Sequence, residues 1–274
     1  MFAKIISHTN LEAAYLEIVE QFSADRRNFK YHGPDNIFLR DLDIRSGELI
    51  KIIRSDLLQK KEIEPALSVK IPKNNKPDEY REIFIYNLKE RVKAQAIYRV
   101  VLPEFEKVFS GRLFSYRPGK PPYLAARLFC RRYRREFGRD QALILDLKNY
   151  SDKIDRELMF VKLQEIFHDR QVLSLLRLFV FNRIYRDGLV LTPDRGLVQG
   201  VPLIALFANL YLTDLDFKYQ ARVSFYIRVG DDIALLDRSA SRLEETLAEI
   251  RKDISARGLE INAKKLFLGA ASGR

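Results

Sequence analysis

The sequence is poor in the residues that build disulfides and zinc sites. It contains one cysteine, Cys130, and three scattered histidines, His8, His32 and His168. A single cysteine cannot form an internal disulfide, and this set cannot supply a Cys/His zinc site. We therefore expect any catalytic metal to be held by oxygen atoms, which makes the carboxylates the residues to follow.

Long apolar segments are also missing. No stretch reaches the roughly eighteen apolar residues that a membrane span needs, and the N-terminus lacks a charged segment followed by a long apolar run. We expect no membrane span, no signal peptide and no membrane partner, and these absences predict a cytoplasmic protein.

Positive charge is what the sequence has in excess. Lys and Arg number 48 against 37 Asp and Glu among 274 residues, which gives a formal net charge of +11. Such an excess favours a polyanionic partner, and nucleic acid is the first candidate. The 13 tyrosines and 18 phenylalanines offer surfaces for base stacking, although most aromatic residues of a folded domain belong to its core.

The positive charge is densest in a predicted helix over residues 122–137. Leucine and phenylalanine recur there at helical spacing, so one face is apolar and the other is basic. The basic residues are Arg127, Arg131, Arg132, Arg134 and Arg135. A solvated face and a phosphate-binding face are both consistent with such a run, and the net charge favours phosphate binding.

Asp146 is an acid in an apolar environment. It lies in the run 143–147, which reads as a buried strand, and burying an unpaired carboxylate is costly. Asp146 therefore needs a cation. A lysine or arginine partner would satisfy it, and so would a metal ion.

Asp231 and Asp232 are adjacent acids in the apolar segment 225–236. Alternating apolar residues before Gly230 and an apolar run after Asp232 predict strand, turn and strand, with both acids at the turn. A solvated Gly-Asp turn is one interpretation. Neighbouring like charges raise each other's pKa, so a divalent metal would stabilise them.

Together, Asp146, Asp231 and Asp232 predict a carboxylate cluster that binds Mg²⁺. Two such ions about 3.5–4 Å apart serve phosphoryl or nucleotidyl transfer. Strands that carry acids, interleaved with helices in the second half of the chain, predict an α+β fold with an antiparallel sheet and helices packed on one face. A further helix is expected over residues 89–101, ending before Pro103.

The order of these motifs resembles the reverse transcriptases of the bacterial, group II intron-like type. Asp146 in its strand, the segment 195–212 with Gln199 and Gly200, and the segment 226–232 resemble the palm of that family. Residues 258–265 look like the next palm motif, and residues 71–73, 81–83 and 113–120 look like the fingers motifs. The resemblance runs in the right order over residues 11–268.

The resemblance implies roles for individual residues. Asp146, Leu147, Asp231 and Asp232 would bind two Mg²⁺ ions, with Mn²⁺ as a substitute. Lys265 would donate a proton to the departing pyrophosphate, although an exposed lysine is also commonly just solvated.

The remaining implied roles concern substrates. The incoming nucleotide would be bound by Lys73, Arg81, Tyr150, Ser151, Gln199 and Gly200. The nucleic acid would be bound by Arg117, Lys120, Arg131, Arg132, Arg134 and Arg135. Gln199 and Gly200 also read as a polar turn before a helix that starts near Pro202.

The sequence departs from the family pattern at three places. Val229 and Gly230 stand where an aromatic and a small residue are usual, and Ile204-Ala205 replaces Ser-Pro. Ser151 stands five positions after Asp146, where the family has a bulky aromatic that excludes the 2′-hydroxyl of a ribonucleotide. Tyr150 would replace that aromatic if the strand end bulged by one residue, and otherwise sugar discrimination should be weak.

The expected organisation is a fingers subdomain with the basic helix over residues 1–140 and a palm over residues 141–274. The sequence ends soon after the palm, so the thumb is expected to be absent or truncated. The alternatives are a longer natural chain, a partner protein or further domain that supplies the thumb, and an unusual mode of priming that replaces it. The predicted function is an RNA-directed DNA polymerase that extends a primer on an RNA or DNA template with nucleoside triphosphates. An atypical polymerase making RNA or untemplated product in antiviral defence, a CRISPR-associated or diversity-generating enzyme, and a non-catalytic nucleic-acid-binding relative remain alternatives.

Overall fold

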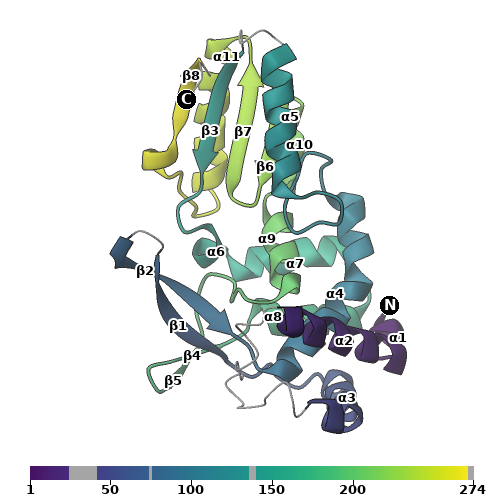
Figure 1. The fold of residues 1–274 in the computed structure, drawn as a ribbon. Helices are drawn as coiled ribbons and strands as arrows, with labels where there is room; N and C mark the ends of the chain where they lie inside the picture. Colours follow the sequence, from purple (N-terminus) through teal and green to yellow (C-terminus); the bar gives the residue numbers. More distant parts are fainter. Residues whose placement is uncertain (25–41, 74–75, 136–139, 271–274) are drawn as a thin grey trace. The chain divides into compact units, whose positions relative to one another are not determined.

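We describe the protein from a computed structural model that covers residues 1–24, 42–73, 76–135 and 140–270 (Figure 1). Side chains are described for these residues except 22–24, 42–45, 73 and 76–79. The chain forms two compact units, each built from two segments. The first unit is Met1–Glu104 with Arg156–Ala205, and the second is Phe105–Asp155 with Leu206–Arg274. The division into fingers over 1–140 and palm over 141–274 stays a prediction.

The first unit combines helices with a four-stranded sheet. The helices are α1 (Phe2–Ile5), α2 (His8–Ala24), α3 (Leu42–Gln59), α7 (Arg156–Ile166) and α8 (Arg170–Val180). The strands are β1 (Ala66–Lys73), β2 (Lys76–Ile85), β4 (Ile184–Arg186) and β5 (Leu189–Leu191). They lie in the order β2-β1-β4-β5, and only the β1–β4 pair is parallel.

Helices α4 (Leu88–Val108) and α9 (Pro202–Tyr211) begin in the first unit and end in the second. The expectation that the first of these ends before Pro103 is wrong, because α4 continues through the proline to Val108. Proline removes one helical hydrogen bond and crowds the preceding turn. Phe105 is fully buried in the added turn, and its burial offsets this cost.

The second unit is built on an antiparallel sheet in the order β6-β7-β3-β8. Its strands are β3 (Gln141–Asp146), β6 (Phe225–Val229), β7 (Asp232–Asp237) and β8 (Phe267–Ala270). Its helices are α5 (Pro122–Arg135), α6 (Tyr150–Lys153), α10 (Thr213–Gln220), α11 (Ala240–Ser255) and the short 3-10 helix η3 (Ala263–Lys265). The predicted strand-turn-strand segment and the predicted α+β class are confirmed.

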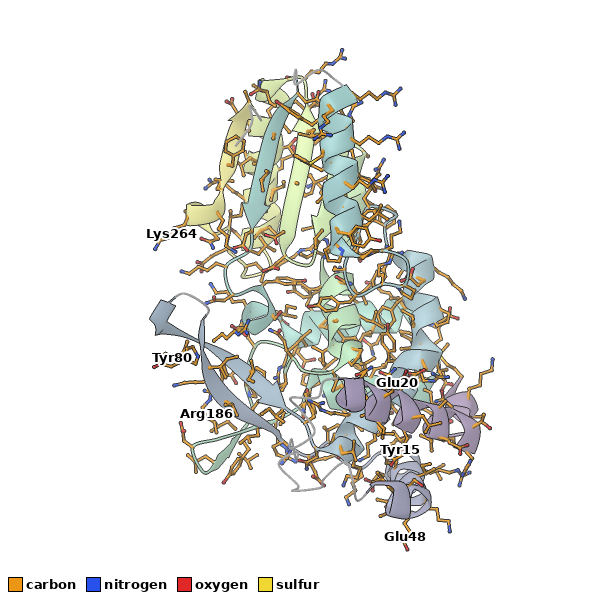
Figure 2. The ribbon with its side chains drawn as sticks, viewed as in Figure 1. Tyr15, Glu20, Glu48, Tyr80, Arg186 and Lys264 are labelled. Atoms are coloured by element: carbon orange, nitrogen blue, oxygen red, sulfur yellow. The ribbon has the colours of Figure 1, made fainter. Side chains whose placement is uncertain are left out.

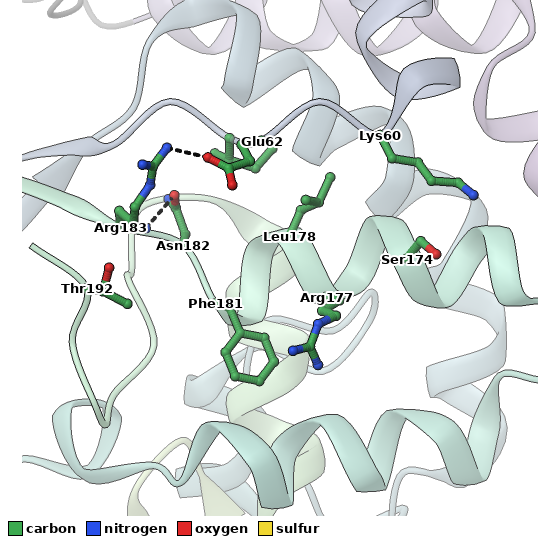
Figure 3. A pocket seen from close by; sticks show the side chains of 10 residues that line it. Lys60, Glu62, Ser174, Arg177, Leu178, Phe181, Asn182, Arg183 and Thr192 are labelled. Atoms are coloured by element: carbon green, nitrogen blue, oxygen red, sulfur yellow. Dashed lines mark hydrogen bonds and ion pairs between the residues drawn. The ribbon is translucent and has the colours of Figure 1, made fainter. Parts of the chain in front are cut away.

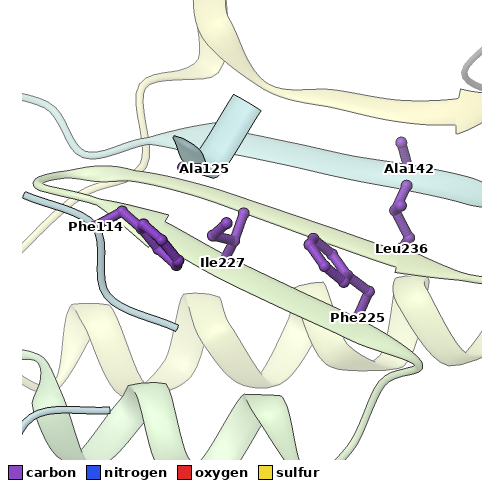
Figure 4. Packing of buried hydrophobic residues seen from close by; sticks show 6 residues of the cluster. All are labelled: Phe114, Ala125, Ala142, Phe225, Ile227 and Leu236. Atoms are coloured by element: carbon purple, nitrogen blue, oxygen red, sulfur yellow. The ribbon is translucent and has the colours of Figure 1, made fainter. Parts of the chain in front are cut away.

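The basic helix α5 packs its apolar face on this sheet. A buried cluster joins Ala125 of α5 to Phe114, Ala142, Phe225, Ile227 and Leu236 (Figure 4). Phe129 of α5 meets the Phe225 ring edge-on at 6.1 Å between centroids. Figure 1 shows α5 in front of the sheet and α11 behind it, so helices lie on both faces rather than on the single face expected. In the part of the chain that the structure describes, no helix combines the length and the apolar character that crossing a membrane requires.

Candidate active site

The acids predicted as metal ligands meet at one end of the sheet of the second unit. Asp146 is the last residue of β3 and Asp232 is the first residue of β7, and the two are directly opposed in the antiparallel register. Asp231 precedes Asp232 in the turn that joins β6 to β7. Three carboxylates from two segments far apart in the sequence therefore share one end of the sheet.

The turn between β6 and β7 has two residues, Gly230 and Asp231, because Val229 pairs with Asp232. Gly230 has a φ of +63°. A left-handed residue at the first position of a two-residue loop matches the twist of the two strands, and glycine adopts it without strain. A side chain at position 230 would meet nothing within 4 Å, so the requirement for glycine is conformational rather than steric.

Burial and mutual repulsion raise the pKa of the acids in the turn. For Asp231, burial is the largest cause, followed by the negative charges of Asp232 and Asp146. For Asp232, burial again comes first and the charge of Asp146 adds to it. The ammonium of Lys265 opposes both shifts. The two acids of this pair would therefore be stabilised by a bound cation.

Two residues of the segment after α11 hold the carboxylate of Asp146. Lys265 Nζ lies 2.6 Å from Oδ2, and Asn262 Nδ2 donates to Oδ1 at 2.9 Å. The main-chain amide of Asn262 also donates to the Asp146 carbonyl at 2.8 Å. The hydrogen bond to Asp146 raises the pKa of Lys265, which keeps the ammonium charged. Sequence reasoning placed Lys265 here but missed Asn262, which lies three residues before it in the same motif.

The donor set of this site suits Mg²⁺, since carboxylate oxygens are the ligands that a hard divalent cation prefers. Among the described residues, no three acids, histidines or cysteines are already arranged around one point as metal ligands. Binding would thus require these carboxylates to rearrange, and Lys265 and Asn262 hold that of Asp146 in the present arrangement. The side chain of Leu147 is apolar and buried, so it has only its main-chain carbonyl to offer.

Tyr150 and Ser151 follow β3 and differ in exposure. The Tyr150 ring is 5% exposed, and its hydroxyl donates to the Ala208 carbonyl at 2.5 Å. Burial raises its pKa. Tyr150 thus has a core position, and a role as the wall of a sugar pocket would require it to leave that position. Ser151 is half-buried, and its side chain is small.

The cations predicted to bind nucleic acid fall into two groups. Arg131, Arg134 and Arg135 are exposed on α5, whereas Arg132 lies 3.7 Å from the buried Asp140. In Figure 2 nitrogen-tipped side chains of α5 extend away from the sheet. Arg127 is exposed on the same helix.

Arg117 and Lys120 belong to the second group, which is occupied within the protein. Arg117 is nearly buried, pairs with Glu106 at 2.7 Å and donates to the Ser110 carbonyl at 2.6 Å. Lys120 donates to the Gly111 carbonyl at 2.7 Å. Their donors hold the loop before α5, and this geometry argues against direct contact with nucleic acid.

Four of the residues predicted to bind the nucleotide, Lys73, Arg81, Gln199 and Gly200, belong to the first unit. Arg81 lies exposed on β2 and follows the exposed Tyr80 in the sequence. Tyr80 is labelled in Figure 2. The side chain of Lys73 lies outside the described residues. Gln199 is exposed, and the loop before it is held by Tyr86, whose hydroxyl donates to the Val198 carbonyl at 2.6 Å.

Gly200 has a structural reason to be glycine. Its φ is +119°, and a Cβ there would lie 2.5 Å from the main-chain oxygen of Phe84. The close approach that requires glycine is thus made by strand β2, which is a different partner from the nucleotide that sequence reasoning invoked.

A cavity of about 470 Å³ in the first unit has a different character from the acid cluster (Figure 3). Lys60, Arg177 and Arg183 line it. Glu62, the single acid among its described lining residues, pairs with Arg183 at 2.8 Å. Arg177 lies over the ring of Phe181 at 4.3 Å. With one acid already paired, this cavity lacks the ligands for a divalent metal.

Comparison with known proteins identifies the class. Residues 71–271 match the family model of the reverse transcriptase (RNA-dependent DNA polymerase), so the chain belongs to the reverse transcriptase family. No curated protein gave a match.

Among solved structures, the chain is similar to a telomerase from Candida albicans in complex with a TWJ fragment of telomeric RNA. The TM-score is 0.60 at 13% identity, over 78% of this chain and 44% of that chain. The chain thus spans under half the length of the structure it matches, and at this identity the likeness shows the fold. The predicted resemblance to reverse transcriptase fingers and palm is confirmed.

Proposed function

We propose that the protein is an RNA-directed DNA polymerase of the bacterial, group II intron-like type, which adds nucleotides to the 3′-hydroxyl of a primer. The observation that carries the proposal is the opposed pair Asp146 and Asp232 with Asp231 in the adjoining turn. Membership of the reverse transcriptase family supports it.

The three acids would hold two Mg²⁺ ions. The chemistry that such ions supply is activation of an attacking oxygen and stabilisation of a leaving group. Lys265, charged and beside Asp146, is the proton donor proposed for the departing pyrophosphate. Arg81 and Lys73 would bind the triphosphate, with Gln199 and Gly200 at the nucleotide.

The template backbone would lie along the exposed arginines of α5. Arg127, Arg131 and Arg134 recur every three or four residues, so they form one stripe along the helix. Four residues of helix rise about 6 Å, which is close to the reach between successive phosphates of an extended strand. The apolar side of α5 is fixed on the sheet, so the stripe is presented by a rigid element.

The test is primer extension by the purified protein with defined RNA and DNA templates. Asp231→Asn keeps the shape of the side chain and removes a ligand charge, and we expect synthesis to fall by about 10²-fold or more. Asp187→Asn is the matched control, because Asp187 is exposed in a left-handed turn that asparagine also adopts. Undiminished synthesis by Asp231→Asn would refute the assignment.

Ser151 favours a second candidate, which is synthesis with ribonucleotides. A site without the usual aromatic offers no wall against a 2′-hydroxyl, so the same assay is run with dNTPs and with rNTPs, with and without template. Incorporation of rNTPs at a rate similar to dNTPs favours RNA synthesis, and product without template favours the untemplated alternative. Roles in antiviral defence, CRISPR adaptation and diversity generation are alternatives that share this chemistry. No product with either substrate favours the non-catalytic alternative.

A further inference from the structure

Arg228 is a charged residue enclosed in the core of the second unit, three residues before Asp231. It lies on β6 and is fully buried, as is its partner Asp216 on α10. Nε and Nη2 of Arg228 each donate to one oxygen of the Asp216 carboxylate at 2.6 Å. The planar guanidinium and the carboxylate therefore meet at two points, which fixes the orientation of both groups.

The remaining donors of Arg228 reach two main-chain carbonyls. Nη1 donates to the Gly230 carbonyl at 3.0 Å, and Nη2 donates to the Asn209 carbonyl at 2.9 Å. Tyr226 completes the arrangement by donating its hydroxyl to Asp216 at 2.7 Å. One side chain thus connects α9, α10 and the turn that carries the acids.

The other peptide group of Gly230 is held as well. Its amide donates to Ser115 Oγ at 2.9 Å. Ser115 in turn exchanges hydrogen bonds with Asn209, through its hydroxyl at 3.0 Å and its carbonyl at 2.8 Å. Both the amide and the carbonyl of Gly230 are therefore held by side-chain hydrogen bonds, and Asp231 follows Gly230 directly in the chain.

Stability alone does not explain an ion pair in this place. Exchanging a buried ion pair for apolar residues of similar size is often neutral or stabilising, because the desolvation of two charges is avoided. An apolar pair, however, has no donor for the carbonyl of Gly230. What Arg228 adds is a fixed position for a turn whose acids repel each other.

We propose that Arg228 is a positioning residue for the metal site, which fixes the main chain of the Gly230–Asp231 turn and so the place from which Asp231 can bind a divalent cation together with Asp146 and Asp232. This inference rests on the proposed polymerase function. Asp216 supplies the countercharge, and Ser115 with Asn209 holds the opposite side of the turn. The group that binds at the site is a divalent cation, and Mn²⁺ alone is the probe.

The test measures the Kd for Mn²⁺ by electron paramagnetic resonance, together with thermal unfolding, on the whole chain. Arg228→Lys keeps the charge beside Asp216 but cannot span Asp216, Asn209 and Gly230 at once. We expect it to fold and to bind Mn²⁺ about 10–100-fold more weakly, the range seen when residues that orient metal ligands are changed. Arg257→Lys is the matched control, since Arg257 also bridges a carboxylate (Asp214) and a carbonyl (Tyr211); its Kd should equal that of the wild type.

Two further variants separate positioning from folding. The double variant Arg228→Met with Asp216→Leu removes both charges together and should stay folded with the same weak Mn²⁺ binding. Ser115→Ala removes only the hydroxyl that accepts the hydrogen bond from the Gly230 amide. We expect a several-fold rise in the Kd for Mn²⁺, and this variant tests the proposal if both Arg228 variants unfold. Folded variants with the wild-type Kd would overturn the positioning role. Absence of Mn²⁺ binding by the wild type would instead overturn the proposed function.

Discussion

Gly200 offers a sharp test of what a glycine in a nucleotide-binding motif is for. Its φ of +119° is one that residues with a side chain rarely adopt, and such strain costs on the order of 1–3 kcal/mol. An added Cβ would also lie 2.5 Å from the Phe84 oxygen and 3.3 Å from the Tyr86 ring. The first contact is against main chain in a strand, so it cannot be relieved by turning a side chain.

We therefore expect Gly200→Ala to lower the free energy of unfolding by about 3 kcal/mol or more, which is a large share of the roughly 5–15 kcal/mol of a typical domain. The measurement is urea unfolding followed by circular dichroism. Gly47→Ala is the control, because Gly47 lies in helix α3 with nothing within 4 Å of the added carbon. Alanine is the better helix former, so this variant should gain up to about 1 kcal/mol.

The result that would refute the reasoning is a Gly200→Ala protein as stable as the wild type. If that protein also lost affinity for nucleotides, the close approach would belong to the nucleotide after all. A destabilised variant that, where folded, still binds nucleotide would show that Gly200 serves the packing of its loop on strand β2.

Two further outcomes are expected. Replacing Arg131 and Arg134 by glutamine should weaken binding to a single-stranded oligonucleotide and reduce the slope of log K against log salt by about 0.7 for each phosphate that the protein no longer neutralises. The control double variant on α11, Arg251→Gln with Lys252→Gln, should leave the slope unchanged. If the two double variants have equal slopes, the α5 stripe does not bind the oligonucleotide. Tyr150→Phe should cost about 1 kcal/mol in urea unfolding, because the Ala208 carbonyl loses its buried donor, and it should leave the ratio of dNTP to rNTP incorporation as it was. A changed ratio of dNTP to rNTP incorporation would show that Tyr150 takes part in sugar discrimination.

The parts of the site that could be predicted from sequence are those where a residue contradicts its neighbours. Asp146 is an acid in an apolar run, and Asp231 and Asp232 follow a glycine between two apolar segments. Both the strands and the acids could therefore be predicted from the sequence. The register that opposes Asp146 to Asp232 could not be predicted, since it depends on which strands pair. Sequence pattern carries no such information for strands 86 residues apart, counted from Asp146 to Asp232.

Arg117 and Arg228 show that the sequence also does not reveal which arginines are paired within the fold. Both are arginines that a basic composition would assign to nucleic acid, yet Arg117 is tied to Glu106 and Arg228 to Asp216. Each partner lies on another element, so only the folded chain reveals that the charge is used. For Arg228 a signal existed, because it interrupts an otherwise apolar strand. The prediction for the end of α4 was wrong for a different reason. Proline does disfavour the interior of a helix, but burial of the turn after Pro103 outweighs that local cost.

The departure of this chain from the usual motif before its paired acids has a physical interpretation in these contacts. Val229 packs against the cluster under α5, so it keeps the anchoring role of a larger apolar residue. Gly230 takes the left-handed conformation without the strain that another small residue would carry. Glycine alone would leave the turn loose, because it has the most conformational freedom to lose on folding. The hydrogen bonds from Arg228 and to Ser115 remove that freedom at the two peptide groups of Gly230. Flexibility required by the turn and rigidity required by the acids are thus supplied by different residues, which is why a change at Arg228 is expected to alter cation affinity more than the fold.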